Sequence, residues 1–449
     1  MNRCRGLSLI ELMIAMALGL LVSLGIVAVF TSTSNSRQGQ EQLARLQEEG
    51  RFAITQIRND LAMAGAQYCN GTGGTAHASV AGPYLDGPRL PTVYASDPNA
   101  LMGALSDVST GWGGAYPSEP RGPYSLPSFL MMRGYDCTVS SCTPVEPSNK
   151  RNPAGFSIPA MGKGVDSRVI GASVLTVRYL NAAGGWAIVP QGSAAGSKLT
   201  SHADGSLTIQ LNPLPGEPKT SDVKKDSSLV MLADCSSAQI FAVTGMGGTT
   251  LTSTGANFAQ PHVFQNMAAP KLFSVSRDMR TVTYYLRVKD NGDGMGHTTG
   301  ALMRRVNGGD ASQSGGSGEE IARGVERLDF KYGVQQSDGT LRYYSAEQVD
   351  NSTRADCPSV PVAIPGSSDR GCLWGAVSLI EVDLLMSGQN PLYSLTPDEL
   401  AYSYAADGIF TPAAPTADDR KVTPLQQGFP LPVLRREFTA VVAVRNANP

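Results

Sequence analysis

The chain has 449 residues, with 38 acidic and 36 basic side chains and a net charge of −2. Such a balance leaves no basic field of the kind that binds nucleic acid non-specifically, so no nucleic-acid partner is expected. The 49 glycines and 29 prolines predict a loop-rich protein, and the length is sufficient for a large hydrophobic core.

The N-terminus has the pattern of a membrane helix. Arg3 and Arg5 precede a nearly continuous apolar run, Leu12–Phe30, which is long enough to span a bilayer. The basic residues predict that the extreme N-terminus stays in the cytoplasm. Glu11 stands at the edge of this run, where a carboxylate is costly and usually functional.

Two simpler interpretations of this segment are a secretory signal peptide and a plain membrane anchor. A signal peptide would not place Glu11 within its apolar core, and no clear A-x-A cleavage site follows Phe30. A plain anchor explains the hydrophobicity but not the spacing between Gly6 and Glu11.

The segment from Gly6 to Met13 resembles the processing signal of type IV prepilins and type II secretion pseudopilins. The resemblance implies cleavage by a prepilin peptidase after Gly6 and N-methylation of Leu7. It also implies that Glu11 pairs with the N-terminal amine of a neighbouring subunit, an arrangement in which two charges in lipid compensate each other. Leu7 and Ser8 stand where the family usually has Phe and Thr.

Helical periodicity continues beyond the membrane. Apolar residues recur at Leu43, Leu46, Ala53 or Ile54, Ile57 and Leu61, and the pattern stops at Gly65. Gly39 and Gly50 are poor helix formers that could bend this rod. We therefore expect a leader over 1–6, a transmembrane half-helix over 7–30, a periplasmic half-helix over 31–65 and a head over 66–449.

The head is predicted to be rich in β-structure, which makes the fold class α+β with a long N-terminal helix. Residues from Cys69 to about Ser125 read as long loops with short structured pieces. Strand-like runs then recur at Ser128–Arg133, Ala172–Leu180, Ser206–Leu211, Ser228–Leu232, Lys271–Val288, Ala301–Val306, Val325–Val334, Ala376–Leu385 and Phe438–Arg445.

The cysteines predict an oxidising compartment. Cys4 would leave with the leader, and the six others form an even set: Cys69, Cys137, Cys142, Cys235, Cys357 and Cys372. Short spacings favour Cys137–Cys142 and Cys357–Cys372, which leaves Cys69 for Cys235. Six cysteines permit 15 pairings, and buried free thiols remain the alternative.

No pattern in the sequence indicates catalysis, a metal or a cofactor. The four histidines are widely separated and lack metal-ligand spacing. The stretch Asp290–Gly294 resembles a calcium loop only superficially, because glycine occupies two ligand positions, and a turn between strands explains it better. The protein is therefore not expected to be an enzyme.

Several head segments resemble the PilW-type minor pilins, among them Ser173–Tyr179, Leu232–Phe241 and Leu434–Asn446. This resemblance implies a minor pilin that helps initiate type IV pilus assembly and sits at the tip. Its implied partners are other minor pilins and pilin subunits, the prepilin peptidase, the inner membrane and a PilY-type tip adhesin. The alternatives are a J-type minor pseudopilin of type II secretion, and a tip adhesin or DNA-uptake module.

Overall fold

The fold is described from a computed structural model. The described residues are 8–68, 76–79, 82–85, 90–106, 120–147, 158–222, 229–234, 237–258, 269–307, 318–335, 340–353, 356, 371–430 and 432–444.

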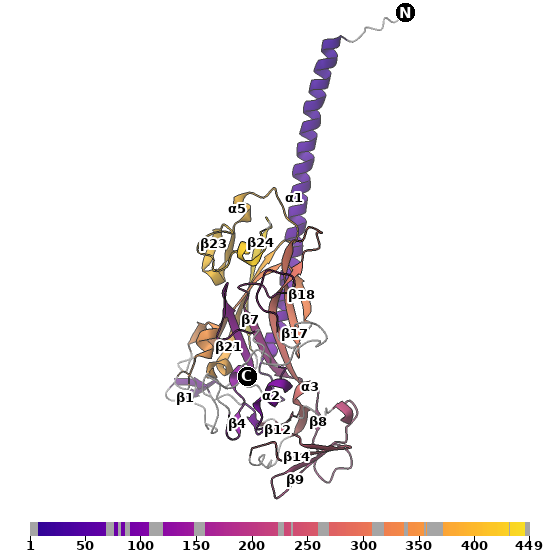
Figure 1. Ribbon diagram of the computed structural model, residues 1–449, viewed down its shortest axis with the longest axis vertical. Helices are drawn as coiled ribbons and strands as arrows, with labels where there is room; N and C mark the ends of the chain where they lie inside the picture. Colours follow the sequence, from indigo (N-terminus) through magenta and orange to yellow (C-terminus); the bar gives the residue numbers. More distant parts are fainter. Residues whose placement is uncertain are drawn as a thin grey trace, which may run out of the picture.

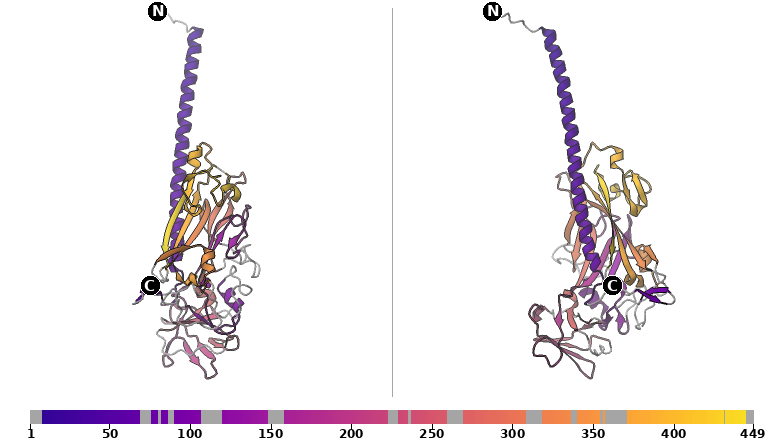
Figure 2. Two further views of the ribbon diagram at one scale, coloured as in Figure 1. Left: turned by 90° about the vertical axis from the view of Figure 1, so that its left-hand side faces the viewer. Right: turned by 180° about the vertical axis from the view of Figure 1, so that it is seen from behind.

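A single long helix, α1 (Leu9–Met63), forms the stalk, as its sequence periodicity predicts. Its 55 residues correspond to roughly 80 Å. The first half projects from one end of the head, and the second half lies along it (Figures 1 and 2). Leu46, Ala53, Ile57 and Leu61 are buried against the head, whereas the apolar residues up to Phe30 are exposed.

The helix α1 packs against two antiparallel sheets. The six-stranded main sheet has the order β18 (Glu319–Arg323), β17 (Thr298–Val306), β16 (Met279–Asp290), β7 (Val174–Leu180), β5 (Met132–Cys137) and β6 (Cys142–Thr143). The four-stranded C-terminal sheet has the order β20 (Leu341–Tyr344), β19 (Val325–Gln335), β21 (Val377–Ser387) and β24 (Arg435–Ala443). Side chains from both sheets and from α1 share one hydrophobic core.

Two further sheets lie at the end of the head opposite the stalk (Figure 1). One has the order β4 (Tyr124–Ser125), β3 (Thr92–Val93), β12 (Ala238–Ala242), β11 (Leu229–Ala233), β15 (Lys271–Ser274) and β8 (Trp186–Ala187). The other has the order β13 (Gly245–Gly247), β14 (Thr250–Ser253), β10 (Leu207–Gln210) and β9 (Lys198–Ser201). They enclose a second core around Trp186 and Phe241.

Short elements complete the described part of the chain. Two hairpins pair β1 (Ala76–Ser79) with β2 (Gly82–Leu85) and β22 (Tyr402–Tyr404) with β23 (Ile409–Ala413). The short helices are α2 (Pro98–Ala104), α3 (Val275–Asp278), α4 (Ala346–Asp350), α5 (Pro397–Leu400), α6 (Pro424–Gln427) and the 3₁₀ turns η1 (Ser128–Leu130), η2 (Thr220–Asp222), η3 (Cys372–Ala376) and η4 (Ala405–Asp407).

Two predicted strands are wrong in part. Ser128–Leu130 forms the 3₁₀ turn η1 after Pro127, and the strand β5 starts only at Met132. The run Lys271–Val288 is broken by α3, because the Asp278 carboxylate accepts a hydrogen bond from the Ser274 backbone N–H at 2.8 Å. This side-chain bond offers the backbone a local turn in place of an extended strand.

Gly50 is required by close packing. A Cβ atom at Gly50 would lie 2.5 Å from the ring of Phe438 on β24, whereas a Cβ at Gly39 would meet nothing within 4 Å. The helix runs without interruption through both glycines. Gly50 thus lets β24 approach the stalk, a role that helix propensity alone does not reveal.

We predict that Gly50→Leu destabilises the head by about 1–3 kcal/mol, because the new side chain must displace the Phe438 ring. Gly39→Leu is the matched control, and it should leave stability unchanged or raise it slightly through helix propensity. Thermal unfolding followed by near-ultraviolet circular dichroism measures both. Equal stability of the two variants would contradict this role of Gly50.

Candidate assembly site

The helix start is built by a reciprocal hydrogen-bond pattern. Ser8 is the N-cap, and its hydroxyl oxygen accepts a hydrogen bond from the Glu11 backbone N–H at 3.2 Å. The Glu11 carboxylate accepts hydrogen bonds from the Ser8 backbone N–H at 3.0 Å and from the Ser8 hydroxyl at 3.1 Å. Such a capping box satisfies backbone donors that the first helical turn leaves open.

This arrangement places Glu11 within a segment that suits a bilayer. Within the described residues, α1 is long and apolar enough to cross a membrane, and its N-terminal half touches no part of the head. Gly6 and Leu7 lie outside the described residues, so cleavage after Gly6 and the pairing of Glu11 with a neighbouring amine stay predictions.

The other end of the stalk is fixed by a buried carboxylate. Asp60 on α1 accepts two hydrogen bonds from the Arg304 guanidinium, at 2.6 Å and 3.0 Å. It also accepts one from the Tyr179 hydroxyl at 3.1 Å and one from the Tyr284 hydroxyl. These three partners lie on β7, β16 and β17, so one carboxylate joins the helix to three adjacent strands of the main sheet.

Burial and charge act together on this cluster. Burial raises the pKa of the Tyr284 and Tyr179 hydroxyls, so both stay protonated and act as donors. The hydrogen bonds to Asp60 raise the pKa of Arg304, which keeps its charge. A buried ion pair is retained only when further hydrogen bonds satisfy it, and the two tyrosines supply them here.

Sequence reasoning missed this cluster. The available signal was position, because Asp60 falls three residues after Ile57 on the apolar stripe that faces the head. Its partners Tyr284 and Arg304 stand directly opposite each other in the β16–β17 pairing, which no local sequence pattern reveals.

The chain leaves the helix directly into the main sheet. The Gly65 N–H donates to the Arg178 carbonyl at 2.8 Å, and the Leu180 N–H donates to the Ala66 carbonyl at 2.8 Å. Gly65 has a φ of 71°, a backbone conformation that glycine adopts without strain. The stalk is therefore held on both sides of its last turn, by Asp60 before it and by β7 after it.

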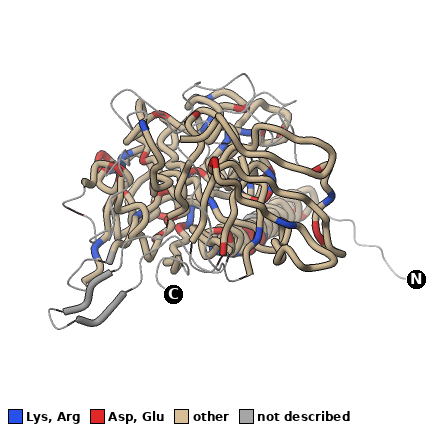
Figure 3. The backbone as a smooth tube through the Cα atoms, turned by 90° about the horizontal axis from the view of Figure 1, so that it is seen from below, with Lys and Arg blue, Asp and Glu red and all other residues tan. Residues whose placement is uncertain are grey.

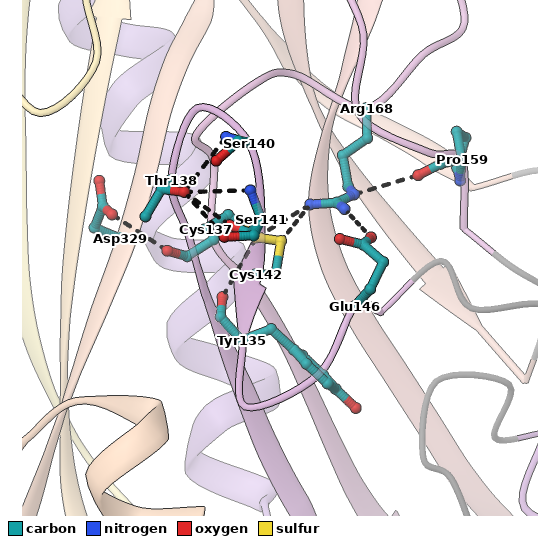
Figure 4. Close-up of a disulfide and its surroundings, with 11 residues drawn as sticks. Tyr135, Cys137, Thr138, Ser140, Ser141, Cys142, Glu146, Pro159, Arg168 and Asp329 are labelled. Carbon is teal, nitrogen blue, oxygen red and sulfur yellow. Dashed lines mark hydrogen bonds and ion pairs between the residues drawn. A yellow bond between two sulfur atoms is a disulfide. The ribbon is translucent and has the colours of Figure 1, made fainter.

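The predicted Cys137–Cys142 disulfide is present at the β5–β6 hairpin (Figure 4). The Arg168 guanidinium lies against it, with Nη1 at 3.2 Å from the Cys137 sulfur and 3.4 Å from the Cys142 sulfur. Arg168 also donates to the Pro159 carbonyl at 3.2 Å and forms an ion pair with Glu146. The buried arginine thus ties the hairpin to two neighbouring loop segments.

The remaining cysteine pairs stay predictions. Cys372 is disulfide-bonded, but Cys357, its predicted partner, lies outside the described residues, as do Cys69 and Cys235. Flanking residues support the long pair. The Tyr68 ring lies 5.5 Å from the Phe273 ring on β15, and Ala233 pairs with Lys271 on the same strand.

The described side chains include no group of three His, Cys, Asp or Glu residues that could hold a metal ion. Asp290–Gly294 begins at the last residue of β16 and continues into the connection to β17, as predicted for a turn. Basic and acidic residues are interspersed over the described head without a large region of one sign (Figure 3).

The class is that of a prepilin-like protein. Its features are a helix long and apolar enough to cross a membrane, an acidic residue near the start of that helix, and a β-rich head joined to its end. The comparisons agree with this class. Residues 1–27 match the prokaryotic N-terminal methylation motif, and residues 283–446 match the family Type IV Pilus-assembly protein W, PilW. The chain thus contains a PilW region together with an N-terminal methylation motif, and PilW is a family of structural pilus proteins rather than enzymes. Comparison with curated proteins and with solved structures gives no match.

The PilW region contains much of the stalk-binding surface. It begins within β16 and extends past β24, and so includes Tyr284, Arg304 and Phe438. Tyr179 and the two sheets at the far end of the head lie outside it. The region that carries the family match therefore overlaps the part of the head that packs against α1, to which β7 also contributes.

We predict that Asp60→Ala destabilises the head by about 3–5 kcal/mol, because it removes both hydrogen bonds to the Arg304 guanidinium and leaves this partly buried cation with the exposed Glu319 carboxylate at 3.6 Å. Glu41→Ala is the control, since Glu41 forms an exposed ion pair with Arg45 on the same helix, worth less than about 1 kcal/mol. Chemical unfolding of both variants tests this. Equal midpoints would show that the Asp60 cluster does not stabilise the docked helix.

We predict Cys69–Cys235 and Cys357–Cys372 as the two pairs beyond Cys137–Cys142. Closing the long Cys69–Cys235 loop should stabilise the head by about 3–5 kcal/mol relative to the reduced form. Peptide mapping without reductant identifies the pairs. A disulfide that joins a cysteine of one predicted pair to a cysteine of another, or free thiols at Cys69 and Cys235, would contradict the scheme.

Proposed function

We propose that the protein is a minor pilin that helps initiate type IV pilus assembly and remains in the tip-associated minor pilin complex. The observation that carries this proposal is the joining of a prepilin-type N-terminus to a PilW region that packs on the same helix. The large head supports a tip position, because the 386 residues that follow α1 would be difficult to repeat along a filament.

In this proposal each part of α1 has one task. Residues 7–30 hold the subunit in the inner membrane with the head in the periplasm, after removal of residues 1–6 by the prepilin peptidase. During assembly the Glu11 carboxylate pairs with the amine of a neighbouring Leu7. Other minor pilins, pilin subunits and a PilY-type adhesin are the proposed partners at the cell surface.

Processing provides the first test. We predict that the mature protein begins with N-methylated Leu7, because the spacing of Gly6 and Glu11 fits the methylation motif. Mass spectrometry of the N-terminal peptide measures this directly. Gly6→Leu should leave an uncleaved precursor in the inner membrane, whereas cleavage near residues 31–36 would identify a secretory signal peptide instead.

Glu11 provides the second test. We predict that Glu11→Ala inserts and is cleaved normally but fails to support piliation, because loss of one partner of a buried pair costs about 3–5 kcal/mol. Complementation of a deletion strain, with surface pili counted and membrane protein levels measured by immunoblot, gives the result.

Ser8→Ala is the matched control for this experiment. It removes the hydroxyl that caps the helix but keeps the Glu11 carboxylate, so piliation should persist if processing is normal. Full piliation by Glu11→Ala would show that the acid is dispensable. If loss of the protein impairs secretion through a type II system and leaves pili unchanged, the J-type pseudopilin is the correct assignment.

A further inference from the structure

The most exposed apolar side chains of the head gather at its stalk end. Four large apolar residues of the described head are at least 60% exposed: Met295 at 67%, Tyr393 at 75%, Phe410 at 79% and Leu425 at 63%. Single exposed apolar residues are ordinary, but a set of four confined to one end of a molecule indicates an interaction surface.

Contacts between distant segments place these residues at one end. The β16–β17 connection, which carries Met295, is joined to the lobe of residues 388–434 by a hydrogen bond from the Asn291 side chain to the Gln389 carbonyl at 2.9 Å. Thr298 reaches the Gly428 carbonyl at 3.4 Å, next to the helix that carries Leu425. Tyr393 and Phe410 belong to the same lobe.

This lobe lies beside the part of α1 that leaves the head. Gly388 at its start packs against Gln42, and Gln389 donates to Glu49 at 3.5 Å. Figures 1 and 2 show α5 and β23 beside α1, on the side of the head that faces the N-terminus. The lobe is thus the part of the head nearest to residues 8–30.

The helix sets the distance to the bilayer. From Phe30 to Gln42 the rise is only about 18 Å. The headgroup layer beyond the hydrocarbon occupies roughly 5–8 Å of this. A lobe that extends from Gln42 toward the N-terminus therefore enters the narrow space next to the headgroups.

We infer that the stalk-end surface, Met295, Tyr393, Phe410 and Leu425, rests on the outer leaflet of the membrane that α1 spans. Aromatic and apolar side chains at a membrane surface insert among the headgroups, where the rings of Tyr and Phe are partly removed from water. The inference rests on the proposed membrane insertion of residues 7–30. It assigns the lobe a partner in the subunit before assembly, which the proposed pairing of Glu11 does not.

The charges nearby favour an apolar rather than an electrostatic contact. Acidic residues of the lobe include Asp398, Glu399, Asp418 and Asp419. The exposed basic residues are Lys421 in the lobe and Lys163, which donates to the Leu425 carbonyl at 3.4 Å. Because acidic side chains outnumber basic ones here, such a surface gains little from anionic lipids. The contact should therefore form on zwitterionic phosphatidylcholine and should not weaken with salt.

Tryptophan reporters in the full-length protein test this surface. The protein is reconstituted into phosphatidylcholine vesicles with and without bromine on the acyl chains, which quenches tryptophan in contact with lipid. Phe410→Trp reports on the lobe, Phe30→Trp reports on the membrane helix, and Tyr343→Trp on β20 is a half-exposed control away from the stalk end. The native tryptophans are the same in all three.

The fluorescence of each introduced tryptophan is the difference between the variant and the wild-type protein. Brominated lipid should reduce this fluorescence in Phe410→Trp and Phe30→Trp but not in Tyr343→Trp. Replacing Tyr393, Met295 and Leu425 by serine should abolish the quenching of Phe410→Trp, with the near-ultraviolet spectrum unchanged. Equal quenching of Phe410→Trp and Tyr343→Trp would overturn the inference, and continued quenching of Phe30→Trp would then leave the membrane span intact. Absence of quenching at Phe30→Trp would overturn both.

Discussion

A buried carboxylate on the stalk helix is the constraint on which the arrangement of this protein depends. Asp60 cannot face the core without compensation, so the helix can dock only where Arg304, Tyr179 and Tyr284 converge. Apolar contacts of Leu46, Ala53 and Ile57 would tolerate sliding or rotation by themselves, because hydrophobic burial has no direction. The polar cluster removes that freedom and gives the stalk one register on the head.

This register has consequences for both ends of the head. The close approach of Gly50 to Phe438 and the pairing of Ala66 with Leu180 require the same placement of α1. Because the helix is continuous, the orientation fixed near Asp60 also sets the direction of residues 9–30. The lobe of residues 388–434 and the two far sheets are thus held at opposite ends of the head. The lobe lies toward the exposed apolar half of the helix, and the far sheets lie away from it (Figure 2).

The sequence was most informative where the physical cause was local. Helical periodicity predicted a stalk ending near Ala64, and the helix ends at Met63. The short spacing of Cys137 and Cys142 predicted their disulfide. The break at α3 could not be predicted in this way, because it depends on one hydrogen bond of Asp278 that competes with an otherwise strand-like pattern.

The docking cluster was beyond sequence reasoning for a different reason. Asp60 is separated from Tyr179 by 119 residues and from Arg304 by 244 residues, and their meeting depends on the register of three strands. Tyr284 in isolation looks like an ordinary residue on a sheet face. A polar residue on an apolar helix face indicates that a hydrogen-bonding partner is needed, but only the folded sheet shows which residues are the partners.

Glu11 and Asp60 solve the same problem in two different ways. Each is a carboxylate on a surface of α1 that is otherwise suited to apolar surroundings, and each needs donors. Asp60 finds all of its donors within the chain, so its contacts are complete before assembly. Within the part of the chain that the structure describes, the donors to Glu11 are the neutral groups of Ser8, which stabilise a carboxylate less than an opposite charge does. The Asp60 end of the helix is therefore fully bonded within one subunit. In the proposed assembly, the Glu11 end gains free energy when a neighbouring amine replaces Ser8.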